Sequence, residues 1–130
     1  STRAPQWTGG GVVFAPTPRD YSVKMNKKER RLALKSALTS RVQENKLIVL
    51  DELKLDEVKT KAMQNVLNNL NVSKAMVVLA DNDANVVLSA RNIPDVITAL
   101  PNTINVYDVL KYNTVILTKA SAAAIEEVYA

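Results

Sequence analysis

The first 26 residues combine cationic side chains with aromatic ones, and this combination is able to bind nucleic acid. The members of the set are Arg3, Trp7, Phe14, Arg19, Tyr21 and Lys24. Guanidinium and ammonium groups bind phosphate oxygens, while aromatic rings and arginine planes stack on unpaired bases. We therefore predict RNA contacts from Arg3, Trp7, Arg19, Tyr21 and Lys24. A solvated charged surface is the alternative interpretation.

All three glycines of the chain stand together as Gly9, Gly10 and Gly11. Residues without a side chain let the backbone approach phosphates closely and present its N–H groups. We include the triplet in the predicted RNA site for this reason. A flexible hinge is the other interpretation, because glycine runs commonly serve as hinges.

A second cluster of cations opens the segment that follows the arm. Its members are Lys27, Lys28, Arg30, Arg31 and Lys35. Asn26 is a good helix cap, with Glu29 three residues later as its reciprocal partner. At about 100° per residue the first basic positions point to nearly every side, and an apolar stripe develops only after Leu32. We expect the first turn to project from the body and bind phosphates.

The predicted apolar stripe of this helix consists of Leu34, Ala37, Leu38 and Val42. The spacing of these residues is that of a helix face that packs on a core. The later turns should therefore dock on the body while the first turn remains free.

Carboxylates that follow two predicted strands are the main evidence for an enzyme. They are Asp51 and Glu52 after the first strand, and Asp81, Asn82 and Asp83 after the second. Ligands of parallel α/β proteins bind beyond such strand ends, so these oxygens could hold Mg²⁺ or a substrate. The alternative is that they form turns and cap helices.

The rest of the sequence argues against catalysis. The chain has no cysteine and no histidine, so thiolate chemistry, disulfides and the commonest general base are excluded. The glycine triplet does not follow a strand and open a helix, so no phosphate loop can be built. We expect no enzyme, cofactor or metal; a small nucleotide-binding α/β enzyme using Asp51 and Asp81 is the alternative of a different class.

The charge is unevenly distributed along the chain. Residues 1–46 carry ten Lys and Arg against three Asp and Glu, whereas residues 47–130 carry seven against ten. This asymmetry predicts a polyanionic partner for one part of the surface. Apolar runs are only a few residues long, far short of the roughly 18–20 that a membrane span needs, and no secretory signal is visible.

The alternation of elements predicts an α/β fold with a mostly parallel sheet flanked by helices. Residues 1–26 hold the glycines and three of five prolines, and should form an extended basic arm. Residues 27–130 should form one α/β domain that begins with the basic helix. We predict strands over 47–50 (buried on both faces), 75–80, 98–100 and 114–118, and further helices over 63–70, 86–91, 105–110 and 121–128, the last capped by Ser121.

Five strings resemble the bacterial large-subunit ribosomal protein L-four family. They are RAPQWTGGGVVF from Arg3, PTPRDY from Pro16, KKERRLALKSAL from Lys27, LSARN from Leu88 and NVYD from Asn105. The match runs in order through essentially the whole chain. It implies a structural protein of the cytoplasmic ribosome that binds large-subunit ribosomal RNA, contacts neighbouring ribosomal proteins and takes part in subunit assembly.

The resemblance also implies further contacts and one departure. Some members repress their own operon, so a messenger leader RNA is an alternative partner, and Arg91 in the LSARN string is a candidate RNA contact that could instead cap or pair within the body. Members of the family begin well upstream of Ser1. We therefore expect a carboxyl-terminal portion that starts on the returning arm of a long loop. Thr8 stands where many members have an arginine, so the phosphate contact expected of that arginine does not carry over to this position.

Overall fold

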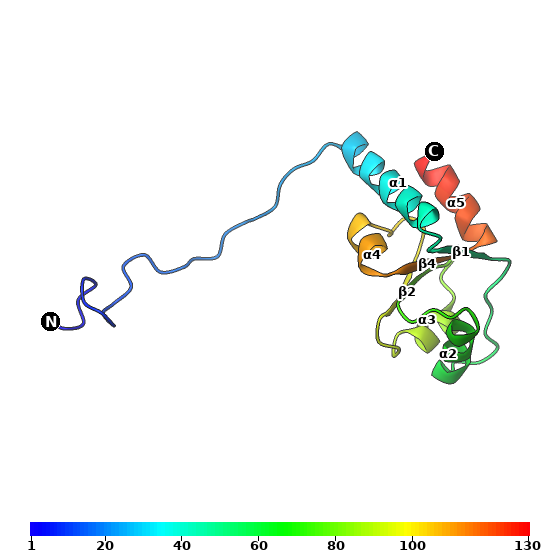
Figure 1. Ribbon diagram of the computed structural model, residues 1–130, viewed down its shortest axis with the longest axis horizontal. Coiled ribbons are helices and arrows are strands. Elements are labelled where there is room, and N and C mark those ends of the chain that lie inside the picture. The colour runs from blue at the N-terminus through cyan, green and yellow to red at the C-terminus, as the bar shows by residue number, and fades with distance from the viewer.

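Four parallel strands form the sheet of the computed structural model, which describes residues 1–130 (Figure 1). They are β1 (Leu47–Leu50), β2 (Ala75–Val78), β3 (Val96–Ala99) and β4 (Thr114–Thr118). The strands lie in the order β1-β4-β2-β3. The central strand β2 pairs with both neighbours, so that Met76 lies opposite Val115 on one side and Ile97 on the other.

Five helices cover the two faces of this sheet. They are α1 (Lys27–Gln43), α2 (Thr60–Asn69), α3 (Ala84–Ala90), α4 (Val106–Lys111) and α5 (Lys119–Tyr129). Met63 of α2 and Val86 of α3 pack with Val77 in one hydrophobic cluster. Leu34 of α1 and Val109 of α4 pack with Met76 and its neighbours in the other, together with parts of α5. The predicted α/β class with a parallel sheet between helices is confirmed.

Burial on both faces explains the uninterrupted apolar sequence of the central strands. All four residues of β2 are buried, and successive side chains enter opposite clusters. Every predicted helix and strand occurs, with ends that differ by a few residues. Helix α3 begins at Ala84 rather than near Val86, because Asp83 caps it and accepts a hydrogen bond from the Asn85 N–H at 2.9 Å.

The prediction that strand 47–50 is buried on both faces is wrong. Val49 of β1 is 53% exposed, and its neighbours are only partly buried. Strand β1 pairs with β4 alone and lies at the edge of the sheet. An edge strand is covered on fewer sides than a central one, although its sequence can be equally apolar.

The prediction for the cap of the last helix also needs correction. Thr118, not Ser121, is the N-cap of α5. The Ser121 N–H donates to Thr118 Oγ1 at 3.2 Å, while the Thr118 N–H donates to Ser121 Oγ at 2.9 Å. The two residues therefore form a reciprocal capping box, with Ser121 as its third helical residue.

The inner face of α1 differs from the predicted stripe at one position. Leu34 and Ala37 are buried as expected, but Val42 is 56% exposed. The buried residue in the following turn is Arg41, at 8% exposure. Because Arg41 lies seven residues after Leu34, it falls on the same face of the helix, whereas Val42 is rotated away.

None of the five helices combines the length and the hydrophobicity that a bilayer-spanning segment needs.

Candidate nucleic-acid interface

Residues 1–26 contain no helix or strand and run away from the α/β body as a single extended segment (Figure 1). Arg3, Trp7, Arg19, Tyr21 and Lys24 are all exposed along it. The segment joins the body at the start of α1. Its cations and rings are therefore accessible from solvent along its length.

The glycine triplet closes a compact turn at the far end of this segment. The Gly11 N–H donates to the Arg3 carbonyl at 2.9 Å, and the Gly10 N–H donates to the Trp7 carbonyl at the same distance. A Cβ on Gly10 would lie 1.9 Å from the Ala4 carbonyl oxygen, and Gly9 has a φ of +76°. Both positions thus require glycine for the turn itself. The N–H groups of Gly10 and Gly11 are already used within it.

The middle of the arm presents a stacked pair of side chains. The Arg19 guanidinium lies 4.4 Å from the centroid of the Tyr21 ring. Between them, Asp20 accepts hydrogen bonds from both the N–H and the hydroxyl of Ser22, each at 2.8 Å. The Ser22 N–H is the main cause that lowers the pKa of Asp20, followed by the hydroxyl. The local turn holds the arginine over one face of the ring.

The first turns of α1 carry the second cationic cluster. All five of the predicted contacts there are exposed: Lys27, Lys28, Arg30, Arg31 and Lys35. The Asn26 N–H donates to the Glu29 carboxylate at 3.3 Å, which caps the helix as predicted. None of the four ion pairs in the protein involves the five cations. Their charges are therefore available to an external anion.

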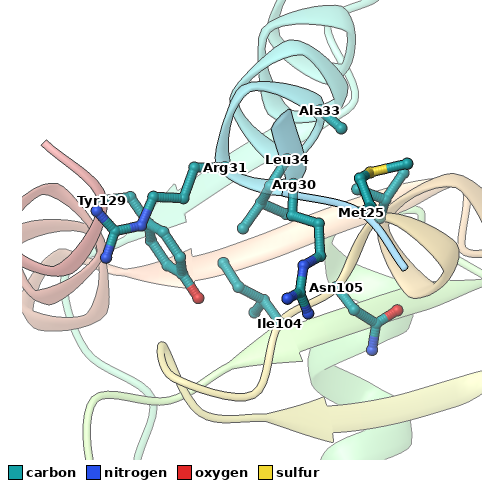
Figure 2. A pocket seen from close by; sticks show the side chains of 9 residues that line it. Met25, Arg30, Arg31, Ala33, Leu34, Ile104, Asn105 and Tyr129 are labelled. Atoms are coloured by element: carbon teal, nitrogen blue, oxygen red, sulfur yellow. The ribbon is translucent and has the colours of Figure 1, made fainter. Parts of the chain in front are cut away.

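An apolar groove lies beside this cluster, between the start of α1, the start of α4 and the end of α5 (Figure 2). Arg30 extends toward Ile104 and Asn105, and Arg31 extends toward the Tyr129 ring (Figure 2). Sequence reasoning did not find this groove, because its walls come from segments about 75 to 100 residues apart in the chain.

Arg91 lies apart from the other predicted contacts. It is the exposed C-cap residue of α3, which packs on the sheet face opposite α1. The structure therefore does not bring Arg91 together with the cations of the arm and of α1.

The carboxylates considered for an enzyme do not gather into one site. Strand β4 lies between β1 and β2, so it separates Asp51 from Asp81. Glu52 pairs with Lys54 and is the main cause that raises the pKa of that lysine, while Asp83 caps α3. No group of three or more His, Cys, Asp or Glu side chains is placed to hold a metal ion.

Arg41 is a buried cation that sequence reasoning missed. Its Nε donates to the Val109 carbonyl at 3.0 Å, and Nη2 donates to the Leu110 carbonyl at 2.9 Å. The sequence signal that could have identified it as buried was its position seven residues after Leu34, on the same face of the helix. This arginine joins α1 to α4 and is no part of the exposed cationic surface.

The fold and the site together define a basic α/β protein with an exposed cationic arm. The profile described as the Ribosomal protein L4/L1 family matches residues 1–128. The chain therefore belongs to the ribosomal protein L4/L1 family, which confirms the resemblance seen in its sequence strings.

Curated relatives agree with this assignment. The chain is 71% identical over 130 residues to the large ribosomal subunit protein uL4 of Agathobacter rectalis. It is 66% identical to that of Lachnoclostridium phytofermentans and 62% identical to that of Lachnospira eligens. In each case the match covers the whole chain and 63% of the relative. The chain thus spans slightly less than two thirds of the length of these relatives.

Proposed function

We propose that the chain is a structural constituent of the large ribosomal subunit that binds ribosomal RNA through residues 1–31. The observation that carries this proposal is the accumulation of unpaired cations on one projecting part of the molecule. Residues 1–31 hold seven Lys and Arg against two Asp and Glu, and all seven are exposed. The binding of a polyanion to such a surface is favourable because it releases the counterions condensed on the polyanion.

Residues 1–26 act as the RNA-binding arm, and residues 27–130 form the domain that supports it. The arm makes no core of its own, so RNA supplies the contacts that order it. The entropy lost in this ordering makes the binding weaker than the contacts alone would give. The body holds the first turn of α1 in the open through the burial of Leu34 and Ala37 in later turns. Its remaining surface contacts neighbouring ribosomal proteins.

The contact residues divide into two roles. Lysines and arginines at positions 3, 24, 27, 28, 30, 31 and 35 position the backbone of the RNA without reading its sequence. Trp7 and the Arg19–Tyr21 pair stack on unpaired bases. Gly9, Gly10 and Gly11 hold the turn that presents Arg3 and Trp7 to the RNA. Arg91 makes a separate contact from the other face of the body.

Salt dependence of binding tests this assignment with two triple variants of the same chemistry. Lys24→Gln/Lys27→Gln/Lys28→Gln removes three cations from the proposed surface. Lys61→Gln/Lys74→Gln/Lys119→Gln removes three unpaired cations from the body. Each lost phosphate contact reduces the slope of log affinity against log salt by about 0.7–0.9. We expect the first variant to reduce this slope by roughly two or more for large-subunit ribosomal RNA.

The control variant should keep the slope of the unaltered chain. Equal reductions of the salt slope in the two variants would show that net charge, and not this surface, binds the RNA. A messenger leader RNA would contact the same residues, so it serves as a competitor in the same assay. A leader that displaced ribosomal RNA at lower concentration would favour the regulatory role instead.

A further inference from the structure

The groove beside the first turns of α1 has the size and the mostly apolar lining of a ligand-binding site. Its volume of about 550 Å³ lies within the range of roughly 300–1,000 Å³ that ligand pockets occupy. Leu34 and Ile104, at 5% and 6% exposure, lie in its interior. Met25 from the end of the arm and Tyr129 from α5 line its sides (Figure 2).

The two neutral polar side chains that line the groove, those of Asn105 and Tyr129, both form hydrogen bonds within the body. The Tyr129 hydroxyl donates to the Pro101 carbonyl at 3.0 Å. The Asn105 side chain accepts from the Asp108 N–H at 2.9 Å and donates to the Asp108 carboxylate at 2.8 Å. Arg30 and Arg31 have no ion-pair partner. An occupant that fits this chemistry has an apolar body and an anionic group beside it.

The groove is continuous with the cationic arm. Met25 is the second residue before α1, and Lys24, Lys27 and Lys28 flank it in sequence. A strand of RNA that follows the arm onto α1 passes the opening of the groove. A nucleotide supplies both of the required parts, because every base has an apolar π face and every phosphate carries a charge.

We propose that the groove accepts one unpaired base of the bound RNA, while Arg30 and Arg31 hold the phosphates on either side of it. The inference rests on the proposed function, because it needs RNA on the arm. Arg30 and Arg31 are engaged with phosphates in this arrangement, and the side chains of Asn105 and Tyr129 form hydrogen bonds within the body. The groove should therefore favour a base over an empty position without requiring one particular base.

The test compares RNA hairpins that differ at a single bulged position. One hairpin carries a bulged adenosine, a second carries a bulged uridine, and a third carries an abasic nucleotide at the same place. All three keep the same number of phosphates. Stacking of one base on a protein surface contributes enough that we expect the full chain to bind the first two roughly tenfold more tightly than the third.

A pair of alanine substitutions locates the preference in the groove. Ala33→Leu places a larger aliphatic side chain at an exposed helical position that lines the groove. Ala123→Leu makes the same change at an exposed position of α5 that does not line it. Both keep a good helix former at a solvent-facing position, and their melting temperatures provide the check on folding. Ala33→Leu should lose the preference for a base, and Ala123→Leu should keep it.

The remaining outcomes separate this inference from the proposed function. If all three hairpins bound equally and with strong salt dependence, no base would enter the groove, although RNA binding would stand. If none bound with salt dependence, the proposed function would fail together with the inference. An acidic peptide with one phenylalanine is the probe for a protein occupant. If this peptide bound the unaltered chain but not Ala33→Leu, and the hairpins showed no preference for a base, the inference would be overturned in favour of a protein partner.

Discussion

The Nε of Arg41 on α1 donates a hydrogen bond to the backbone carbonyl of Val109 on α4, 68 residues away in sequence, at 3.0 Å. Its Nη2 donates to the next carbonyl, that of Leu110, at 2.9 Å, and Nη1 pairs with Glu44 at 2.8 Å. The last carbonyls of a helix have no partner within it. Arg41 therefore supplies donors to the end of the six-residue helix α4 and fixes it against α1.

Removal of this guanidinium should destabilise the whole body. Arg41→Met keeps much of the side-chain volume but leaves the buried Val109 carbonyl and the partly buried Leu110 carbonyl without these donors, so we expect a loss of about 2–4 kcal/mol in the free energy of unfolding. Urea denaturation followed by far-UV circular dichroism measures it. Arg31→Met, at an exposed position, is the control and should change stability by less than about 0.5 kcal/mol. Equal stability of the two variants would contradict the structural role of Arg41.

The turn at the tip of the arm should depend on Gly10 far more than on Gly11. A Cβ on Gly10 would overlap the Ala4 carbonyl at 1.9 Å, whereas one on Gly11 would meet the Arg3 carbonyl at an ordinary 3.6 Å. Gly10→Ala should open the turn and weaken RNA binding, and Gly11→Ala should have a smaller effect. The amide protons of Trp7 and Gly11 report on the turn by NMR. Neither variant should move the unfolding midpoint, since the tip makes no core contact.

The capping box of α5 should show strong coupling between its two members. Thr118→Ala and Ser121→Ala each remove one side chain that accepts a hydrogen bond from the other residue's N–H, and each should cost about 0.5–2 kcal/mol. Because the box is reciprocal, the loss of stability in the double variant should differ clearly from the sum of the losses in the two single variants. Simple additivity within about 0.3 kcal/mol would show that the two bonds act independently.

Glu44 should titrate below its ordinary pKa because of Lys46. The Lys46 ammonium lies 2.9 Å from the Glu44 carboxylate, and this hydrogen bond is the main cause that lowers the pKa of Glu44 from 4.5. A lowered folded-state pKa gives stability that is fully present above the unfolded value and is lost as the pH falls through the folded value. In Lys46→Met the pKa of Glu44, measured by NMR titration, should rise toward 4.5.

Lys54→Met is the control for this titration. It removes the partner of Glu52 and leaves the surroundings of Glu44 unchanged. A rise in the Glu44 pKa in both variants would show that general charge, and not the Lys46 contact, sets the value.

Arg91 should act independently of the arm, because it lies on the opposite side of the sheet from α1. Arg91→Gln should reduce the salt slope of RNA binding by about 0.7–0.9, and its effect should add to that of the Lys24/Lys27/Lys28 variant. Lys61→Gln on α2, which packs on the same sheet face, is the matched control. No change in slope for Arg91→Gln would leave this arginine as a surface residue of the body.

The sequence by itself determined the elements and the class of fold, since both depend on local patterns. Met63 and Leu67 have the spacing of one helix face and are the buried residues of α2, while Asn26 and Asn105 are residue types that cap helices and stand at the starts of α1 and α4. Each of these signals lies within a few residues of the structure that it specifies, where side chain and backbone interact directly. The excess of positive charge over residues 1–46 is likewise a property of the sequence alone.

Only the tertiary structure decided which segments meet. The order β1-β4-β2-β3 left Val49 exposed at an edge and separated Asp51 from Asp81, although the sequences of β1 and β2 are both uninterrupted apolar runs. The same packing buried Arg41 against carbonyls of α4 and built the groove from α1, α4 and α5. Such contacts depend on how distant segments share one core, and a local pattern carries no information on its distant partner.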